Sequence, residues 1–499
     1  MKFSALRACL KIRKCRVVGD SPSQVPCHPT FRALAQHFLI FRQALRLLVC
    51  AAMTGSVLRA DPATLPDPFN LLTQPRLAGD CFGCRPAAET NGVVLSAQSV
   101  SDLLGNTTGG AATGTTYSGL LNLGLAVDLQ KAVGWEGASF KNTWLWLYGN
   151  DLSSQYINNA LTVSSIEGIS TFRCYELWFQ QNLFHDVVSL RGGLLGLDTE
   201  FMTSDTSSLF VNSTFGVPAL FNLNVPNGGP TYPMATPGVR LALQPISWLT
   251  IRSALAQANP FTQQQNLRGF DWNFGSAGGL LSLNEAAASW NKEAQSKGLP
   301  GTAKAGFWLQ TGRDPENTGG SPTEDAFAFG SPEARAFSSG FYGMIDQQLY
   351  AAPGTPTASN GKNPADAGKN PAPPDTVSCT CSGQGLSSFF RVGFSPQQAS
   401  PVGFYSDAGF VYTGLIPTRN ADKLGVAFGY ARMGSQYASQ GSAAGLPGVG
   451  YEAVAELSYS VQLSQAVSIQ PDMQYILHPG GTGQYGNALV VGVRAVVNF

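Results

Sequence analysis

The side chains best suited to chemistry are few after residue 60. Two histidines remain there, His185 and His478, and they lie far apart in the sequence. A hydrolytic site needs a nucleophile, a base within hydrogen-bond reach and a third group that orients the base. His478 stands between Leu477 and Pro479, beside two glycines, which is typical of a residue at the end of a strand. We therefore expect no enzymatic activity.

The cysteines after residue 60 suggest two further kinds of site. Cys81 and Cys84 have the CxxC spacing of redox and zinc sites, but zinc prefers four ligands and few imidazoles are available. In an oxidising compartment the same pair could close a small disulfide ring. Cys379 and Cys381 are too close to bond easily to each other, and Cys174 is most simply a strand residue. The sequence predicts no cofactor and no metal.

The composition is unusual for a soluble enzyme. Charged residues make up 12% of the chain, about half the usual fraction, whereas aromatic residues reach 10% and glycine is abundant. No window holds about 18 consecutive apolar residues, so no helix is expected to span a membrane. Inside a bilayer every backbone N–H and C=O must be paired, and a closed sheet is the alternative to a helix. This composition favours a β-barrel.

Short segments with period-two alternation support that interpretation. In residues 451–464 all seven odd-numbered residues, among them Tyr451 and Leu457, are apolar or aromatic. On the opposite face, six of the seven even-numbered residues are polar or charged, and the seventh is Val454. One such strand also fits a soluble β-sandwich. Many such strands, together with the C-terminal Phe499, favour an all-β transmembrane antiparallel barrel. The same habit occurs in residues 120–130, 239–244, 249–257, 423–433, 467–477 and 489–499.

Three stretches do not look like barrel wall. The chain from Ala351 to Gly385 is rich in Pro, Gly, Ser, Asn and Thr and is predicted to be a long flexible loop. Residues 284–297 (NEAAASWNKEAQSK) contain helix formers and predict a short helix in another loop. Residues 61–90, which include Pro62, Pro66, Pro68 and Pro75, predict an extended periplasmic or plug-side segment before a barrel over residues 91–499. Long loops are expected at one end of the barrel and short turns at the other.

The N-terminal residues 1–60 are interpreted as a leader with a signal peptide. They hold ten Lys and Arg residues and one acidic residue, and Arg42 and Arg46 precede an apolar run. The predicted cleavage point follows Ala60, although Leu58, at the third position before the cut, is not the small residue that such a site prefers. An alternative for the basic residues before the apolar run is a start codon assigned too far upstream. The rest of the chain then carries 21 bases and 30 acids. This acidic balance gives no indication of a nucleic-acid partner.

Several motifs resemble the carbohydrate-selective porin family over nearly the whole chain after residue 76. Residues 79–85 (GDCFGCR) resemble the family's GDWGGxR motif, with Cys81 in place of Trp. This departure and the long segment from Ala351 to Gly385 leave the plug side and the entrance geometry open. Further matching stretches are residues 102–106 (DLLGN), 175–176 (YE), 193–201 (GLLGLDTEF), 212–218 (NSTFGVP), 414–419 (GLIPTR), 470–475 (QPDMQY) and 479–481 (PGG).

The resemblance implies a barrel of about sixteen strands in the bacterial outer membrane, with loops folded inward. It also implies passive uptake of mono- or oligosaccharides through a water-filled channel. The expected surroundings are outer-membrane lipid, and the barrel-insertion machinery is expected to recognise Phe499.

A sugar channel needs paired donors and acceptors that replace the hydration water of a neutral solute. We therefore predict that polar residues on the inner faces of strands line the channel, although each could be an ordinary lumen residue. The stretch 202–218, which follows the GLLGLDTEF motif, is dense in Ser, Thr, Asp and Asn. Asp198 and Glu200 of the motif and Asp205 of this stretch are predicted to line the constriction, unless the Asp and Ser side chains simply cap turns. The strand residues are Arg240, Arg252, Asp346, Arg391, Glu452, Glu456, Gln474 and Arg494.

Three functions remain open from the sequence. The first is a sugar-conducting porin, as the resemblance implies. The second is a porin of the same fold with another solute preference, such as organic acids or general diffusion. The third is a non-conducting structural or adhesive barrel whose loops bind a partner.

Overall fold

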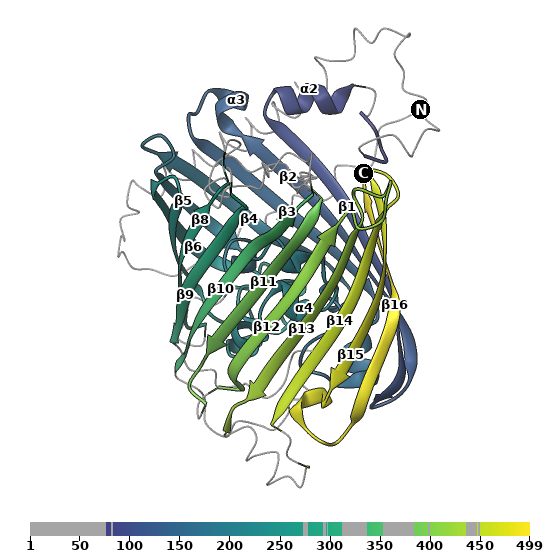
Figure 1. The fold of residues 1–499 in the computed structure, drawn as a ribbon. Helices are drawn as coiled ribbons and strands as arrows, with labels where there is room; N and C mark the ends of the chain where they lie inside the picture. Colours follow the sequence, from purple (N-terminus) through teal and green to yellow (C-terminus); the bar gives the residue numbers. More distant parts are fainter. Residues whose placement is uncertain are drawn as a thin grey trace, which may run out of the picture. The chain divides into compact units, whose positions relative to one another are not determined.

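A computed structural model describes residues 76–80, 83–272, 278–292, 296, 298–311, 337–352, 384–397, 400–435, 447 and 450–499. Within these residues sixteen antiparallel strands form one closed barrel, in which each strand pairs with its neighbours in sequence and β1 pairs with β16 (Figure 1). The all-β antiparallel barrel predicted from the alternation is thus confirmed. The strands are β1 (Val93–Gly110), β2 (Gly114–Asp128), β3 (Ala138–Gly149), β4 (Thr171–Leu183), β5 (Val188–Leu195), β6 (Thr236–Ile246), β7 (Leu249–Gln257), β8 (Leu280–Trp290), β9 (Gly301–Thr311), β10 (Phe337–Ala351), β11 (Gly385–Phe394), β12 (Val402–Thr413), β13 (Lys423–Met433), β14 (Tyr451–Gln462), β15 (Val467–Leu477) and β16 (Gly486–Asn498).

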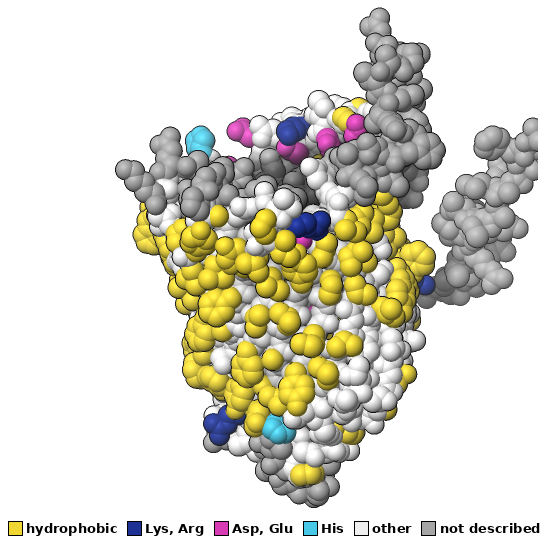
Figure 2. Space-filling model, turned by 45° about the vertical axis from the view of Figure 1, so that its right-hand side comes forward, with side chains coloured by type: hydrophobic (Ala, Val, Ile, Leu, Met, Phe, Trp, Pro, Cys, Tyr) yellow, Lys and Arg dark blue, Asp and Glu magenta, His cyan; other side chains and the backbone are white. Residues whose placement is uncertain are grey.

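The two faces of β14 show why these sequences form a barrel wall. Glu452, Glu456 and Ser458 are buried on the inner face, whereas Leu457 is 40% exposed on the outer face. Hydrophobic side chains cover the outside of the wall, and the few charged side chains in view gather mainly toward its upper and lower margins (Figure 2). The period-two alternation therefore separates an apolar outer surface from a polar interior.

Several predicted segments coincide with strands. Strands β7, β13 and β15 have the same bounds as the alternating segments 249–257, 423–433 and 467–477. Cys174 is a buried residue of β4, as expected. His478 directly follows β15, and its ring makes an edge contact with Tyr451 at 4.6 Å between centroids.

Two predictions of local structure are wrong. The first half of the helix predicted over residues 284–297 is part of strand β8. Glu285 and Ala287 point into the barrel, and pairing of this segment with β7 and β9 overrides its helix propensity. The segment 61–90 is not extended throughout, since Cys84–Thr90 forms helix α2, whose Pro86 stands in the first turn where proline is tolerated. The leader, Cys81, Cys379, Cys381 and most of the segment from Ala351 to Gly385 lie outside the described residues.

The barrel has two different ends. At the terminal end, where β1 begins and β16 finishes, turns such as residues 184–187 and 463–466 are short. At the opposite end, here called the loop end, the connections include residues 150–170, 196–235 and 258–279. The ends of β10 and β11 that residues 352–384 connect lie at the terminal end, so this long connection departs from the expected pattern.

The remaining helices are short. No helix in the described residues is long and apolar enough to cross a membrane. Helix α4 lies within the barrel in Figure 1, and α5 follows it in the same connection. The other α-helices in the described residues are α3 (Leu129–Val133), α4 (Ser213–Gly216) and α5 (Ala219–Asn222). The connections also contain the short helical turns η2 (Ser153–Ile157), η3 (Leu197–Thr199), η4 (Ser207–Leu209), η5 (Pro226–Gly228) and η6 (Pro479–Gly481).

Candidate functional site: the barrel interior

Two connections from the loop end fold into the barrel. We call residues 150–170, between β3 and β4, the first inward loop, and residues 196–235, between β5 and β6, the second inward loop. Their apolar side chains form a buried cluster with inward residues of the wall. Ile157 of the first loop and Phe215 of the second are completely buried there, and Phe221 packs edge-on against Trp308 of β9. The interior is therefore narrowed by a packed core.

Strand β14 binds both inward loops through two carboxylates. Glu452 accepts hydrogen bonds from the backbone N–H groups of Ala160 and Leu161, at 2.8 and 2.7 Å. Four residues further along the same face, Glu456 accepts from Val211 and Asn212 of the second loop, at 2.6 and 3.0 Å. Because backbone N–H groups satisfy a carboxylate without a cation, two predicted lumen acids act as loop anchors.

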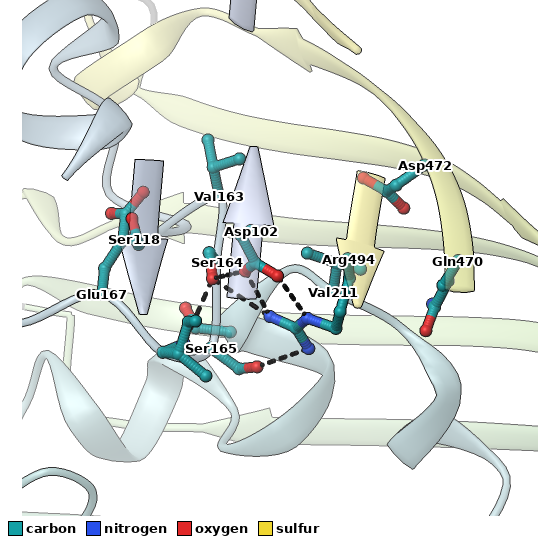
Figure 3. Close-up of polar contacts among 12 residues, drawn as sticks. Asp102, Ser118, Val163, Ser164, Ser165, Glu167, Val211, Gln470, Asp472 and Arg494 are labelled. Carbon is teal, nitrogen blue, oxygen red and sulfur yellow. Dashed lines mark hydrogen bonds and ion pairs between the residues drawn. The ribbon is translucent and has the colours of Figure 1, made fainter. Parts of the chain in front are cut away.

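The inner faces of β15 and β16 add further anchors. Gln474 accepts from the Asn212 side chain at 3.0 Å and donates to the carbonyl of Val163 at 2.9 Å, so that it touches both loops. Arg494 pairs with Asp102 of β1 at 2.7 Å and also donates to the Ser165 hydroxyl at 3.1 Å (Figure 3). These contacts position the loops against the seam that closes the barrel.

Two arginines, from β11 and β6, also bind the second inward loop. Arg391 of β11 pairs with Asp407 and donates to the carbonyls of Thr214 and Phe215, each at 2.9 Å. Arg240 of β6 forms a bidentate pair with Glu200 at 2.7 and 2.9 Å. The six predicted residues Arg240, Arg391, Glu452, Glu456, Gln474 and Arg494 therefore bind loop groups directly, and their contribution to a channel surface stays a proposal.

A cavity of ≈ 400 Å³ lies between the second inward loop and the wall formed by β7, β9 and β10. Five predicted residues line it, three from the loop and two from strands: Asp198, Glu200, Asp205, Arg252 and Asp346. Asp346 accepts from the Ser204 hydroxyl at 2.6 Å, and Arg252 pairs with Glu285 at 3.4 Å. The structure thus brings together residues that are far apart in sequence.

Asp198 and Glu200 occupy different electrostatic environments in the second loop. Burial raises the pKa of Asp198 to about 6, although hydrogen bonds from the Tyr175 hydroxyl and the Tyr232 N–H oppose this. Burial also acts to raise the pKa of Glu200, but the positive charges of Arg191 and Arg240 outweigh it and lower the pKa to about 2. Glu200 is therefore a fixed anion at neutral pH.

The sequence reasoning missed several residues of this cavity. Lys304 of β9 donates to the carbonyl and hydroxyl of Thr203 at 2.5 and 2.8 Å. Lys292, just after β8, also lines the cavity, but it fell within the helix predicted in error. The inward residues Thr302, Lys304 and Gln310 alternate with the outward Phe307 and Leu309, and this alternation could have identified β9.

The histidines do not form a site with each other. His185 lies in the turn between β4 and β5 at the terminal end, whereas His478 follows β15 at the loop end. In the part of the chain that the structure describes, no three His, Cys, Asp or Glu side chains gather in a way that could hold a metal ion.

Comparisons with known proteins agree with this architecture. The family "Carbohydrate-selective porin, OprB family" matches residues 112–499. Porin B of Pseudomonas aeruginosa is 23% identical over 92% of this chain and 98% of its own, and the putative porin QuiX of Acinetobacter baylyi is 25% identical over 91% and 98%.

The high-pH structure of Pseudomonas putida OprB superimposes with a TM-score of 0.70 at 22% identity, covering 86% of this chain and 99% of that one. This structural likeness supports the sixteen-stranded fold, and the family match covers most of the barrel. The chain belongs to the OprB family of carbohydrate-selective porins, which are non-enzymatic channels of the bacterial outer membrane.

Proposed function

We propose that this porin conducts mono- and oligosaccharides by passive diffusion, and that they pass through the cavity beside the second inward loop. The observation that carries the proposal is the ≈ 400 Å³ of space lined by hydroxyl, carboxylate and ammonium groups. This volume is near the lower end of the roughly 300–1,000 Å³ range of small-molecule sites. The family description, which names carbohydrates, supports the same class of solute.

The lining suits a neutral, hydroxylated solute. Thr203, Ser208 and Thr302 offer hydroxyl groups that can donate or accept, and the nearby carboxylates and ammonium groups offer stronger acceptors and donors. A sugar that enters can exchange its hydration water for these partners with little loss of hydrogen bonding. The half-buried Val217 contributes an apolar surface at the same cavity, which suits the apolar face of a sugar ring.

The second inward loop is held firmly enough to define the width of such a path. It is bound by Glu456, Arg391 and Arg240, which belong to three separate strands. Asn224 adds a reciprocal pair of hydrogen bonds with the backbone of Val402, at 2.8 and 2.9 Å. A loop fixed at several points is expected to narrow the channel without opening and closing as a lid.

We also propose that outer-membrane lipid surrounds the apolar wall and that the insertion machinery recognises Phe499. In the folded barrel the Phe499 N–H donates to the carbonyl of Ala97 at 2.9 Å, so the residue continues the pairing of β16 with β1. Recognition is therefore expected before the barrel closes.

Swelling of proteoliposomes tests the solute class. Liposomes that contain the purified porin are expected to swell in isotonic glucose, and more slowly in maltose, because the larger sugar fits a narrow path less well. Protein-free liposomes serve as the control. Swelling in both sugars at the protein-free rate would contradict carbohydrate conduction. Planar-bilayer recordings would then separate a porin for other solutes, which gives stepwise currents, from a non-conducting barrel.

A further inference from the structure

Four charged side chains that line the cavity come from four separate parts of the chain. Asp205 belongs to the second inward loop, Lys292 follows β8, and Lys304 and Asp346 belong to the adjacent strands β9 and β10. We call these four residues the charge tetrad. It contains two positive and two negative groups on one surface of the cavity.

Two members of the tetrad are held by consecutive residues of the loop. Lys304 donates to the carbonyl and the hydroxyl of Thr203, and the Ser204 hydroxyl donates to Asp346 at 2.6 Å. The Thr206 N–H adds a weaker contact with Asp346 at 3.4 Å. These contacts fix one positive and one negative charge at the edge of the cavity.

The other two members are available to a solute. Asp205 is exposed, and among the described residues neither its carboxylate nor the Lys292 ammonium makes a hydrogen bond or an ion pair within the chain. Lys292 nevertheless interacts electrostatically with Asp205, Lys304 and Asp346, so the four charges form one electrostatic group. Substitution of Asp205 or Lys292 therefore changes the charge of the cavity without removing a loop anchor.

The other charges that line the cavity and their ion-pair partners also balance when they are counted with the tetrad. Glu200 lines the cavity and pairs with Arg191 and Arg240, and Arg252 lines it and pairs with Glu285. With Asp198 and the tetrad included, the cavity and these ion pairs hold five carboxylates and five cations. A passing ion of either sign therefore meets repulsion as well as attraction, whereas a neutral polyol finds donors and acceptors together.

We propose that the charge tetrad is the solute-selective surface of the channel and that its balance of charge favours neutral hydroxylated solutes over ions of similar size. This inference rests on the proposed carbohydrate conduction and specifies where and how that conduction discriminates. Asp205 and Lys292 are specificity-determining residues because they contact the solute, and Lys304 and Asp346 complete the balance from fixed positions.

The test uses the full-length protein with two single substitutions of opposite charge effect. Lys292→Met leaves excess negative charge and is expected to shift the reversal potential in a KCl gradient toward cation selectivity. Asp205→Asn is expected to shift it toward anion selectivity and to raise gluconate influx into proteoliposomes several-fold. Both substitutions are expected to lower glucose influx, because each removes one partner of the sugar.

Matched controls are Lys131→Met in helix α3 and Asp271→Asn in the connection after β7, which carry the same charge changes outside the cavity. Neither control should move the reversal potential. If wild-type protein admits glucose but Lys292→Met and Asp205→Asn keep the wild-type reversal potential, or shift it in the same direction, the selectivity inference is wrong while carbohydrate conduction stands. If wild-type protein admits no glucose, the proposed function fails and the inference fails with it.

Discussion

Asp102 of β1 and Arg494 of β16 lie directly opposite each other across the seam that closes the barrel, joined by hydrogen bonds of 2.8 and 2.7 Å. The Ser164 hydroxyl of the first inward loop donates to Asp102 at 2.5 Å (Figure 3). One buried ion pair therefore connects the first and last strands with a loop that narrows the interior. Closure of the barrel and placement of the loop are coupled at this point.

Asp102→Asn is expected to destabilise the folded barrel, because it leaves the Arg494 guanidinium buried without its countercharge. Removal of one partner of a buried ion pair typically costs about 3–5 kcal/mol. The measurement is the temperature at which the folded band is lost on detergent gels. The double variant Asp102→Asn with Arg494→Met should recover part of the loss. A single variant as heat-stable as the wild type would show that the pair does not hold the seam.

Glu456→Gln is expected to loosen the second inward loop. A glutamine oxygen is neutral and cannot replace both charge-assisted bonds from Val211 and Asn212, each typically worth about 1.5–3 kcal/mol. Single-channel currents should become larger and noisier as the loop moves away from β14. Ser460→Ala, on the same face of the same strand, is the control. Wild-type conductance and noise in the Glu456 variant would argue against an anchoring role.

The stability of the protein should fall as the pH rises from about 4.5 to about 8 because of Glu167 in the first inward loop. Burial, and then the charge of Asp151, raise the pKa of its carboxyl from 4.5 to about 8. Over this interval the unfolded chain is ionised while the folded chain retains the proton, so each pH unit costs up to about 1.4 kcal/mol. Thermal unfolding at pH 5 and pH 8 measures the effect.

Glu167→Gln should remove this component, because the amide does not titrate and still offers an acceptor to the N–H groups of Leu152 and Ser153. The variant is expected to gain stability relative to the wild type at pH 8 but not at pH 5. An equal pH dependence in both proteins would mean that Glu167 is ionised in the folded state at neutral pH.

Leu457→Arg tests the environment of the outer wall. Leu457 points outward from β14, and a charge on a lipid-facing position of a barrel costs up to about 2–4 kcal/mol near the middle of the bilayer. The variant should fold less stably into liposomes, as measured by urea titration. Ser460→Arg points inward on the same strand and should be tolerated. Equal stability of the two variants would place the outside of β14 in water.

Much of the wall was predictable from sequence, because period two follows directly from strand geometry. β14 shows this well, since Glu452, Glu456 and Ser458 are polar inside and Leu457 is apolar outside. β8 was missed because alanines occupy both of its faces and Asn284 lies on the outer one, where its side chain bonds Ser253 at 2.7 Å. Its strand state depends on pairing with β7 and β9, which the segment itself does not encode.

For the interior, the sequence indicated which kinds of residue lie there but not which contacts they make. The polar stretch after Asp198 correctly indicated a loop, and Asp205 and Asp346 lie at one cavity. The sequence could not indicate that Glu452 and Glu456 would bind loop backbone, because this depends on how deeply each loop folds into the barrel. Lys292 and Lys304 were missed because their segments were assigned to a helix or left unassigned.

Sugar influx through a Ser208→Cys variant tests the central claim most directly. Ser208 is exposed on the second inward loop and lines the cavity, so a bulky thiol reagent attached there should obstruct the proposed path. Glucose-driven swelling of proteoliposomes should be strongly reduced after reaction of the variant, whereas wild-type protein treated in parallel should keep its rate. Unchanged glucose influx through the fully labelled variant would contradict passage between this loop and the wall formed by β7, β9 and β10.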